Sequence, residues 1–230
     1  MYRCEVRELG RIEYGAAFEA QQRLVEERKL GRIPDQLLLL EHPHTITLGR
    51  NGRMENLLGS DAALRASGIA FHVSDRGGDI TYHGPGQVVG YPILDLNQWK
   101  RDVRQYVRAV EQVMIDALAE FGISAERVCG CTGVWVDGKK IGAIGVHISR
   151  WVTSHGFALN VSTDLSYFGY IVPCGLAKPV TSMAQLGVNA SVADTHRALA
   201  RAFGRVFDRE MELPDLPAAA SQEPGWEKAS

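Results

Sequence analysis

The sequence lacks the long apolar runs that a membrane-spanning helix needs. Its longest runs, Gln36 to Leu40 and Val88 to Leu96, fall far short of the roughly 20 residues required. The first residues, Met1 to Glu8, contain acidic side chains and no apolar core, so they do not support a secretory signal. With 45% hydrophobic and 23% charged residues, the composition is that of an ordinary globular protein, and we expect it to be cytoplasmic.

The chain also lacks an excess of positive charge and a dense set of cysteines. A net charge of −2 argues against a general nucleic-acid binder, which needs a basic surface. Four cysteines in 230 residues indicate free thiols in a reducing compartment. Cys129 and Cys131 are close in sequence, but no second Cys or His pair has zinc-site spacing. We therefore expect no metal site, and read the pair as small thiols in a strand or loop.

Periodic apolar residues predict three helices, at Tyr14 to Glu27, Val103 to Phe121 and Val192 to Phe207. Ser191 is the expected N-cap of the third helix, and Gly122 the stop signal of the second. Strand patterns occur at Leu37 to Glu41, Thr45 to Leu48, Ala70 to Val73, Val88 to Leu94, Gly133 to Val136, Ile141 to Ile148 and Gly156 to Val161.

These elements favour an α+β fold, with helices flanking a mixed or mainly antiparallel sheet. Asp137-Gly138, between two strand patterns, is a strong hairpin signal. We expect a single domain over residues 1–213. Residues 214–230 are rich in Pro, Ala and Glu with few apolar anchors, which predicts a mobile C-terminal tail.

The most distinctive segment is charged and punctuated by glycine, and it reads Arg76-Gly77-Gly78-Asp79-Ile80-Thr81-Tyr82-His83-Gly84-Pro85-Gly86-Gln87. Its first two glycines allow a ligand to approach the backbone closely. The alternation that follows predicts a short strand, which would send Arg76, Thr81 and His83 towards related positions. The segment therefore predicts a binding site, and a polar surface hairpin is the alternative.

Cys174 is the candidate nucleophile, because Pro173 and Gly175 flank it after an apolar stretch. A thiol attacks as the thiolate, so it needs a cation or a base nearby. Lys140, His83 and His155 are the candidates for that group. The alternatives are a buried, inert Cys174 and a solvated hairpin Lys140.

Small residues in two strand patterns leave room for a ligand chain against the backbone. One pattern runs from Lys140 to Val146 and contains Gly142, Ala143 and Gly145, and the other runs from Gly156 to Val161. An acyl tail fits this description. Close packing of neighbouring strands explains it equally well.

Together, the segments at 76–87, 140–145, 155–160 and 173–175 resemble, in order, the octanoyltransferase family, the lipoyl(octanoyl) transferases of lipoate synthesis. The resemblance extends upstream through 38–43 and 47–50, so it spans about residues 9 to 190. Cys129 and Cys131 lie outside the matched motifs.

The resemblance implies a fold shared with biotin- and lipoate-protein ligase catalytic domains. It implies that Cys174 accepts the acyl group and that Lys140, not the adjacent Lys139, promotes its ionisation. The substrate-binding residues that it implies are Arg76, Gly77, Gly78, Asp79, Ile80, Thr81, Tyr82, His83, Ala143, Ile144, Gly145, His155, Gly156, Phe157 and Ala158.

The reaction that the resemblance implies is transfer of an octanoyl group from octanoyl-acyl carrier protein to a lysine of a lipoyl domain. The expected acceptors are the lipoyl domains of 2-oxoacid dehydrogenase complexes and the glycine cleavage H protein. We expect a monomer without cofactor, nucleic-acid or membrane partner.

A local basic rim is the expected docking surface for acidic partners, with members Arg50, Arg53, Arg76, Arg150 and Lys178. Two rival functions are open. One is an ATP-dependent lipoate-protein ligase on the same fold, which has no use for a nucleophilic cysteine. The other is an inactive module that binds acyl carrier protein or lipoyl domains, in which Cys174 is inert.

Overall fold

The computed structural model describes residues 2–172 and 179–213. The described chain forms an eight-stranded sheet, in the order β11-β1-β2-β6-β10-β9-β8-β7, and a three-stranded sheet, β4-β3-β5. The strands are β1 (Tyr2–Arg11), β2 (Asp35–Glu41), β3 (Thr45–Leu48), β4 (Ala70–Val73), β5 (Ile80–His83), β6 (Gln87–Ile93), β7 (Glu126–Val128), β8 (Cys131–Val136), β9 (Lys139–Ser149), β10 (Val152–Asn160) and β11 (Arg209–Glu212). The α-helices are α1 (Tyr14–Lys29), α2 (Asp61–Ala66), α3 (Val103–Ala119) and α4 (Val192–Phe207).

The large sheet is mixed, which confirms the α+β prediction. Its strands β11, β1 and β2 are parallel to one another, and every pairing from β2 to β7 is antiparallel. Helix α1 connects β1 to the parallel strand β2, as a crossover between parallel strands requires. In the small sheet, β3 pairs in parallel with β4 and antiparallel with β5.

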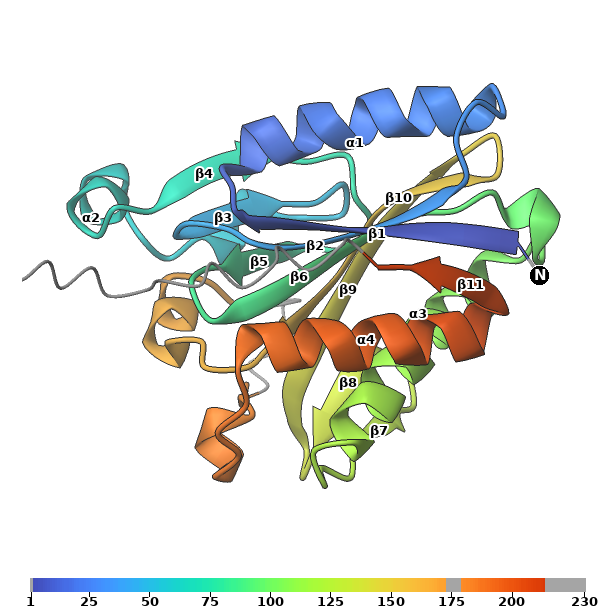
Figure 1. Cartoon of the computed structure of the whole chain (residues 1–230). Coiled ribbons are helices and arrows are strands. Elements are labelled where there is room, and N and C mark those ends of the chain that lie inside the picture. Colours follow the sequence, from blue (N-terminus) through green and yellow to red (C-terminus); the bar gives the residue numbers. More distant parts are fainter. Residues whose placement is uncertain (1, 173–178, 214–230) are drawn as a thin grey trace, which may run out of the picture.

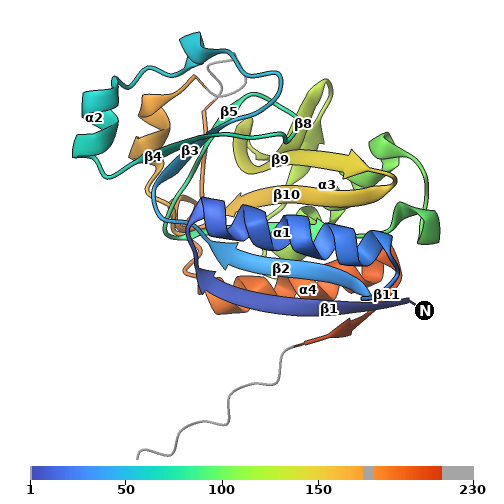
Figure 2. The same cartoon turned by 90° about the horizontal axis from the view of Figure 1, so that it is seen from above.

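Helices cover both faces of the large sheet (Figures 1 and 2). Helix α1 lies on one face, while α3 and α4 lie on the other. The four leucines of β2 explain this arrangement, because successive side chains of a strand point to opposite faces. Leu38 and Leu40 pack in the α1 cluster, and Leu37 and Leu39 pack in the cluster under α3 and α4. A strand buried on both faces has a continuous apolar run instead of an alternating one.

The predicted helix signals are confirmed. The Ser191 Oγ accepts a hydrogen bond from the Asp194 N–H at 3.0 Å, and Gly122 has a φ of +75° after the end of α3. The predicted hairpin joins β8 to β9, where Asp137 and Gly138 have φ values of +47° and +72°. None of the helices in the described ranges is both long enough and apolar enough to span a membrane.

Strands β1, β7 and β11 and the short helix α2 are not in the sequence prediction. Strands β7 and β11 are the two edges of the large sheet and have only three and four residues. Short, charged edge strands avoid pairing with other chains, and they leave little periodic signal. In β1, Cys4 and Val6 point inward among exposed polar residues, so only part of the strand alternates in burial.

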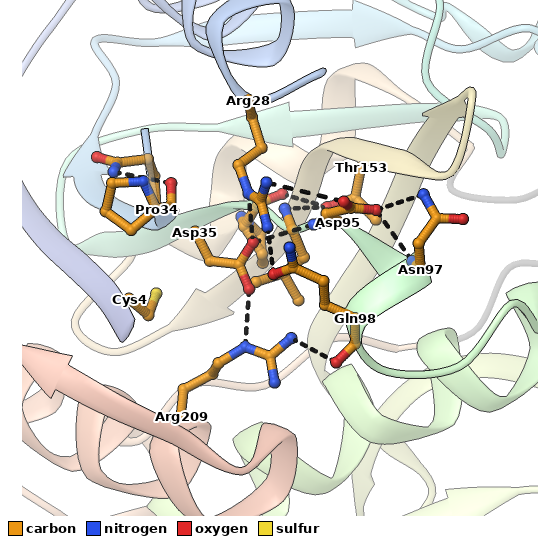
Figure 3. A network of polar contacts seen from close by, with 12 residues as sticks. Cys4, Arg28, Pro34, Asp35, Asp95, Asn97, Gln98, Thr153 and Arg209 are labelled. Atoms are coloured by element: carbon orange, nitrogen blue, oxygen red, sulfur yellow. Dashed lines mark hydrogen bonds and ion pairs between the residues drawn. The ribbon is translucent and has the colours of Figure 1, made fainter. Parts of the chain in front are cut away.

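A buried carboxylate, Asp35 at the start of β2, joins α1 to β11 (Figure 3). Its Oδ1 accepts a hydrogen bond from Arg28 Nε of α1 at 2.8 Å, and its Oδ2 accepts one from Arg209 Nε of β11 at 2.7 Å. The backbone N–H of Asp95 also donates to Oδ1, at 3.0 Å. All three charged side chains of the Arg28, Asp35 and Arg209 cluster are at most 5% exposed. Removing the carboxylate would leave two buried guanidinium groups without this partner.

We predict that Asp35→Ala lowers the free energy of unfolding by about 3–5 kcal/mol, because one partner of a buried ionic cluster is lost. Urea unfolding at neutral pH measures the change. Glu212→Ala, which removes the exposed ion pair with Arg3, is the matched control and should cost at most about 1 kcal/mol. Equal losses in the two variants would contradict the role given to Asp35.

Candidate active site

A cavity of about 560 Å³ lies between the loop at 76–79 with β5 on one side and strands β6, β8, β9 and β10 on the other. Segments separated by more than sixty residues in the sequence meet there. The predicted residues that line the cavity are Arg76, Gly77, Gly78, Asp79, Ile80, Thr81, His83, Lys140, Ala143, Ile144, Gly145, His155, Gly156, Phe157 and Ala158. The structure therefore brings together nearly all of the predicted site.

Among the predicted site residues that the structure describes, Tyr82 alone does not line the cavity. The side chain is fully buried in the core of the small sheet, beside Ile46 and Ile80. Its hydroxyl is 2.7 Å from His44 Nδ1, and its ring stacks on Tyr167 with centroids 5.3 Å apart. Because neighbouring side chains of a strand point to opposite faces, Tyr82 lies on the other face from Thr81 and His83.

Glycines allow the loop at 76–78 to lie directly on β9. The Gly77 N–H donates to the Val146 carbonyl at 2.8 Å. A Cβ atom at Gly145 would be only 2.9 Å from the Gly77 oxygen, and one at Gly49 only 2.4 Å from the Gly78 oxygen. Real Cβ atoms do not approach backbone oxygens this closely. A side chain at Gly145 would push the loop, and the small sheet with it, away from β9, and one at Gly49 would push the loop away from the end of β3.

Arg76 holds the loop from inside. Its Nη2 donates to the Thr47 carbonyl at 2.7 Å and to Thr47 Oγ1 at 2.9 Å, and its Nε donates to the same hydroxyl at 3.2 Å. The residue is only 7% exposed. The expectation that Arg76 belongs to an exposed basic docking rim is therefore wrong, because the guanidinium is committed to β3 and the cavity wall. Lys178, another expected member of the rim, lies outside the described residues.

Asp79 organises the loop that follows β3. Its Oδ2 accepts a hydrogen bond from Asn56 Nδ2 at 2.6 Å, and its Oδ1 accepts from the backbone N–H groups of Ile80 and Arg53 at 2.7 and 3.2 Å. These bonds join residues 53–56 to the start of β5. A carboxylate that accepts several N–H bonds is held in one orientation.

A chain of hydrogen bonds begins at His83 and joins three residues that line the cavity, His83, Gln87 and Asn160. Its Nδ1–H donates to Gln87 Oε1 at 2.8 Å, Gln87 Nε2 donates to Asn160 Oδ1 at 3.0 Å, and Asn160 Nδ2 donates to the Thr181 carbonyl at 2.9 Å. Burial, and then the neighbouring His42 and Arg76, lower the pKa of His83 to about 3. The imidazole is therefore neutral near pH 7.

His155 has a strained backbone and a carboxylate partner. Its φ is +54°, a region that a residue with a side chain seldom adopts. Its backbone N–H donates to Gln21 Oε1 at 2.7 Å, and its Nε2 is 2.6 Å from Asp75 Oδ1. Burial lowers the pKa of His155, and the Asp75 carboxylate opposes part of that shift. Contacts with Gln21 of α1 and with Asp75, which precedes Arg76, thus hold the His155 backbone in this conformation.

Lys140 begins the part of β9 that borders the cavity, as the sequence predicts. Its ammonium nitrogen lies 4.9 Å from the centre of the Trp135 ring of β8, within the range of a cation–π interaction. Trp135 is itself a cavity residue.

Cys174, the predicted nucleophile, lies outside the described residues. The described chain before it is fixed by a hydrogen bond from the Val172 N–H to the Asn56 carbonyl at 2.8 Å. The described chain after it pairs with β9, where Lys140 N donates to the Pro179 carbonyl and Thr181 N donates to the Lys140 carbonyl, both at 2.9 Å.

Several residues that line the cavity are not among the predicted site residues. Cys131, which we expected to lie away from the matched motifs, borders the cavity, while Cys129 is exposed. Gln87 and Asn160 were within reach of sequence reasoning, because a polar residue in an apolar strand must find a partner when buried. Trp135 carries no such signal, and it meets Lys140 only because the hairpin pairs their strands.

The fold and this cavity define the chain as a catalytic domain of the lipoyl protein ligase A/B type, whose family model matches residues 13–204. An octanoyltransferase of Solibacter usitatus is 63% identical over 221 residues, which cover 96% of this chain and all of that protein. This chain belongs to the octanoyltransferase family.

Solved structures show the same fold at low sequence identity. A bipartite lipoate protein ligase of Thermoplasma acidophilum superposes with a TM-score of 0.70 at 17% identity, covering 92% of this chain and 86% of that one. A biotin protein ligase of Aquifex aeolicus gives a TM-score of 0.52 at 11% identity, covering 90% and 70%. The predicted likeness to biotin- and lipoate-protein ligase domains is confirmed for the fold.

We predict that stability falls on acidification partly through His83. Between the ordinary histidine pKa of 6.5 and the folded value of about 3, the unfolded chain binds the proton and the folded chain does not. The free energy of unfolding is therefore fully retained above about pH 6.5 and decreases as the pH falls through this window, by about 1.4 kcal/mol per pH unit for one group.

The variant His83→Asn keeps a donor for Gln87 and removes the titration. Urea unfolding between about pH 7 and pH 4 should give a slope that is shallower by this amount, while the two proteins run parallel above pH 7. Burial lowers the pKa of His42 to about 4, so its titration leaves a residual pH dependence of the unfolding free energy in both proteins. Identical slopes throughout would show that His83 is not held neutral by the fold.

Proposed function

We propose that this chain transfers an octanoyl group from octanoyl-acyl carrier protein to a lysine of a lipoyl domain, through a thioester on Cys174. The observation that carries the proposal is the 63% identity with an octanoyltransferase over almost the whole chain. The cavity gives it a physical basis, since the residues of three matched motifs line one space of a volume usual for ligand pockets.

The first half-reaction exchanges one thioester for another. The Cys174 thiolate attacks the acyl carbon, the new C–S bond forms, and the bond to the carrier's phosphopantetheine sulfur breaks. The released carrier thiolate takes up the proton that the Cys174 thiol lost on ionisation and that Lys140 carried in the meantime, so Lys140 is left as a neutral amine. Because the bond broken and the bond formed are of the same kind, no ATP is required.

Lys140 supplies a positive charge at the cavity, where it favours the thiolate over the thiol. Two observations support this role. Lys140 borders the cavity next to the small residues of β9, and its backbone holds Pro179 and Thr181, which follow the segment that contains Cys174.

The second half-reaction forms an amide. The neutral amine of the acceptor lysine attacks the acyl carbon, the C–N bond forms, the bond to Cys174 breaks, and the amine proton must be accepted. Three basic groups border the cavity for this purpose: Lys140, His83 and His155. Both imidazoles are neutral near pH 7, but a pKa of about 3 makes His83 a weak base. The Asp75 carboxylate opposes part of the lowering of the His155 pKa, which favours His155 over His83 as the acceptor.

The two rival functions share the fold but fit the comparisons less well. The fold neighbours include ligases, so fold alone does not separate transfer from ATP-dependent ligation. Close sequence identity favours transfer, since the similar Solibacter protein is an octanoyltransferase. An inactive binding module would not need a cavity lined by a lysine and two neutral histidines.

The proposed acceptors are the lipoyl domains of 2-oxoacid dehydrogenase complexes and the glycine cleavage H protein, and the enzyme acts as a monomer. With Arg76 buried, docking of an acidic carrier falls to the exposed basic residues, among them Arg50, which precedes the cavity residue Asn51 in the chain.

We predict that octanoyl-acyl carrier protein adds one octanoyl group to the chain and that Cys174→Ala abolishes this adduct. Intact-mass measurement with peptide mapping locates the group, and adding an apo lipoyl domain should remove it from the enzyme. Cys131→Ala is the matched control, because Cys131 is a second thiol on the same cavity. An adduct that persists in Cys174→Ala would contradict the assignment of the nucleophile.

A further inference from the structure

Strand β8 departs from regular pairing directly beside Lys140. Toward β7, Cys131 pairs with Val128 and Trp135 with Glu126, so more residues of β8 than of β7 separate the two pairs. Toward β9, the register shifts between Val134 and Trp135. Such a bulge leaves backbone groups unpaired and redirects side chains. Gly133 lies inside it with a φ of +122°, a value that suits glycine.

The buried carboxylate of Glu111, on α3, accepts a hydrogen bond from the backbone of the bulge. The Gly133 N–H donates to Glu111 Oε1 at 3.0 Å, and Glu111 Oε2 accepts from Arg127 Nε of β7 at 2.9 Å. Arg127 also donates to the Arg108 carbonyl and to Gln112 Oε1, both at 2.8 Å. The Glu111 side chain is only 8% exposed. A buried carboxylate with partners on both oxygens fixes the backbone that it binds.

The Lys140 side chain lies against the bulge at Gly133. A Cβ atom at Gly133 would be 3.3 Å from Lys140 Cε and 3.6 Å from Lys140 Cδ, so the lysine methylenes pass over the bare glycine. The same atom would be 2.6 Å from the Gly142 oxygen, so even alanine does not fit. From there the ammonium group reaches the Trp135 ring, 4.9 Å from its centre.

Trp135 is itself held in place. Its indole N–H donates to the Cys131 carbonyl at 3.3 Å, and the residue is only 2% exposed. A lysine side chain has four rotatable bonds and, on a surface, samples many positions. The Lys140 side chain has fewer positions available, because its methylenes contact Gly133 and its ammonium group contacts the fixed Trp135 ring.

We infer that Trp135 and Glu111 are positioning residues for Lys140, Trp135 through its ring face and Glu111 through the bulge at Gly133. The inference rests on the proposed function, in which the Lys140 ammonium acts on the nucleophile. Positioning matters there, because displacement of a catalytic group by about 1 Å can slow a reaction by up to about a hundred-fold.

The first test compares Trp135→Leu, which removes the ring face, with Trp135→Phe, which keeps one. For acylation by octanoyl-acyl carrier protein, Trp135→Leu should lower kcat about ten-fold with little change in KM, and Trp135→Phe should recover most of the loss. Trp99→Leu is the matched control, because Trp99 makes a similar contact with Lys100 and does not line the cavity. Thermal unfolding of each variant separates lost stability from lost positioning.

A second readout follows Lys140 without any catalysis. The purified proteins are treated with a small amine-acylating reagent, and peptide mapping gives the modification rate of Lys140 relative to the adjacent, exposed Lys139. This ratio should rise in Trp135→Leu, because the ammonium loses its cover, and stay near the parent value in Trp135→Phe and Trp99→Leu. An unchanged ratio with unchanged kcat in Trp135→Leu would overturn the inference.

Glu111 is tested in the same two assays. Glu111→Leu leaves the Gly133 N–H without its acceptor and should lower kcat and raise the Lys140 ratio. Glu111→Gln keeps an acceptor oxygen and should stay close to the parent. Glu120→Gln, on the residue that follows α3, removes only the charge of a carboxylate paired with Arg201 and Arg205, and is the control. If Glu111→Leu does not fold, Glu111→Asp takes its place, because it keeps a charged partner for Arg127 while its shorter side chain withdraws the carboxylate from the Gly133 N–H. A raised ratio and lower kcat in Glu111→Asp support the inference, and parent values there overturn it for Glu111.

The two readouts distinguish failure of this inference from failure of the proposed function. If Lys140→Ala acylates as fast as the parent, the proposed role of Lys140 is wrong, whatever Trp135 does. A raised Lys140 ratio in Trp135→Leu would still establish that Trp135 positions the lysine. If Lys140→Ala is slow but Trp135→Leu matches the parent in both assays, the positioning inference alone fails.

Discussion

The structure of the site depends on one close approach, that of the loop at 76–78 to strand β9. The hydrogen bond from Gly77 to Val146 and the absence of a side chain at Gly145 allow the loop backbone to lie directly on the β9 backbone. This contact brings the small sheet, with β5, over the large sheet. The cavity is the space that remains beside it, so the same glycines that join the sheets also define where a ligand can lie.

Burial then sets the charge of the groups around that space. His83 and His155 are kept neutral by the cost of burying a cation, although Asp75 partly opposes this for His155. Arg76 remains buried because Thr47 accepts three of its hydrogen bonds. The site thus combines neutral imidazoles with cations fixed by the fold, and the proposed transfer needs both a cation beside the thiolate and a proton acceptor.

The parts of this site that follow from local backbone requirements are predictable from the sequence. Glycines at 77, 78 and 145, the hairpin at Asp137-Gly138 and the following Lys140 all leave local patterns, and the structure places them together. Tyr82 belongs to the same sequence motif but does not line the cavity, because a strand sends alternate residues to opposite faces. Asp75, Glu111 and Trp135 were missed because their partners lie on other elements, and no local pattern records a contact between distant segments.

The central claim is that this chain transfers an already activated acyl group. The most direct measurement is modification of an apo lipoyl domain under two conditions: octanoyl-acyl carrier protein without ATP, and free octanoate with ATP and magnesium. Mass spectrometry of the lipoyl domain reads the outcome. The account predicts one octanoyl group on the domain in the first condition and none in the second. Modification only in the second condition would contradict it and identify an ATP-dependent ligase.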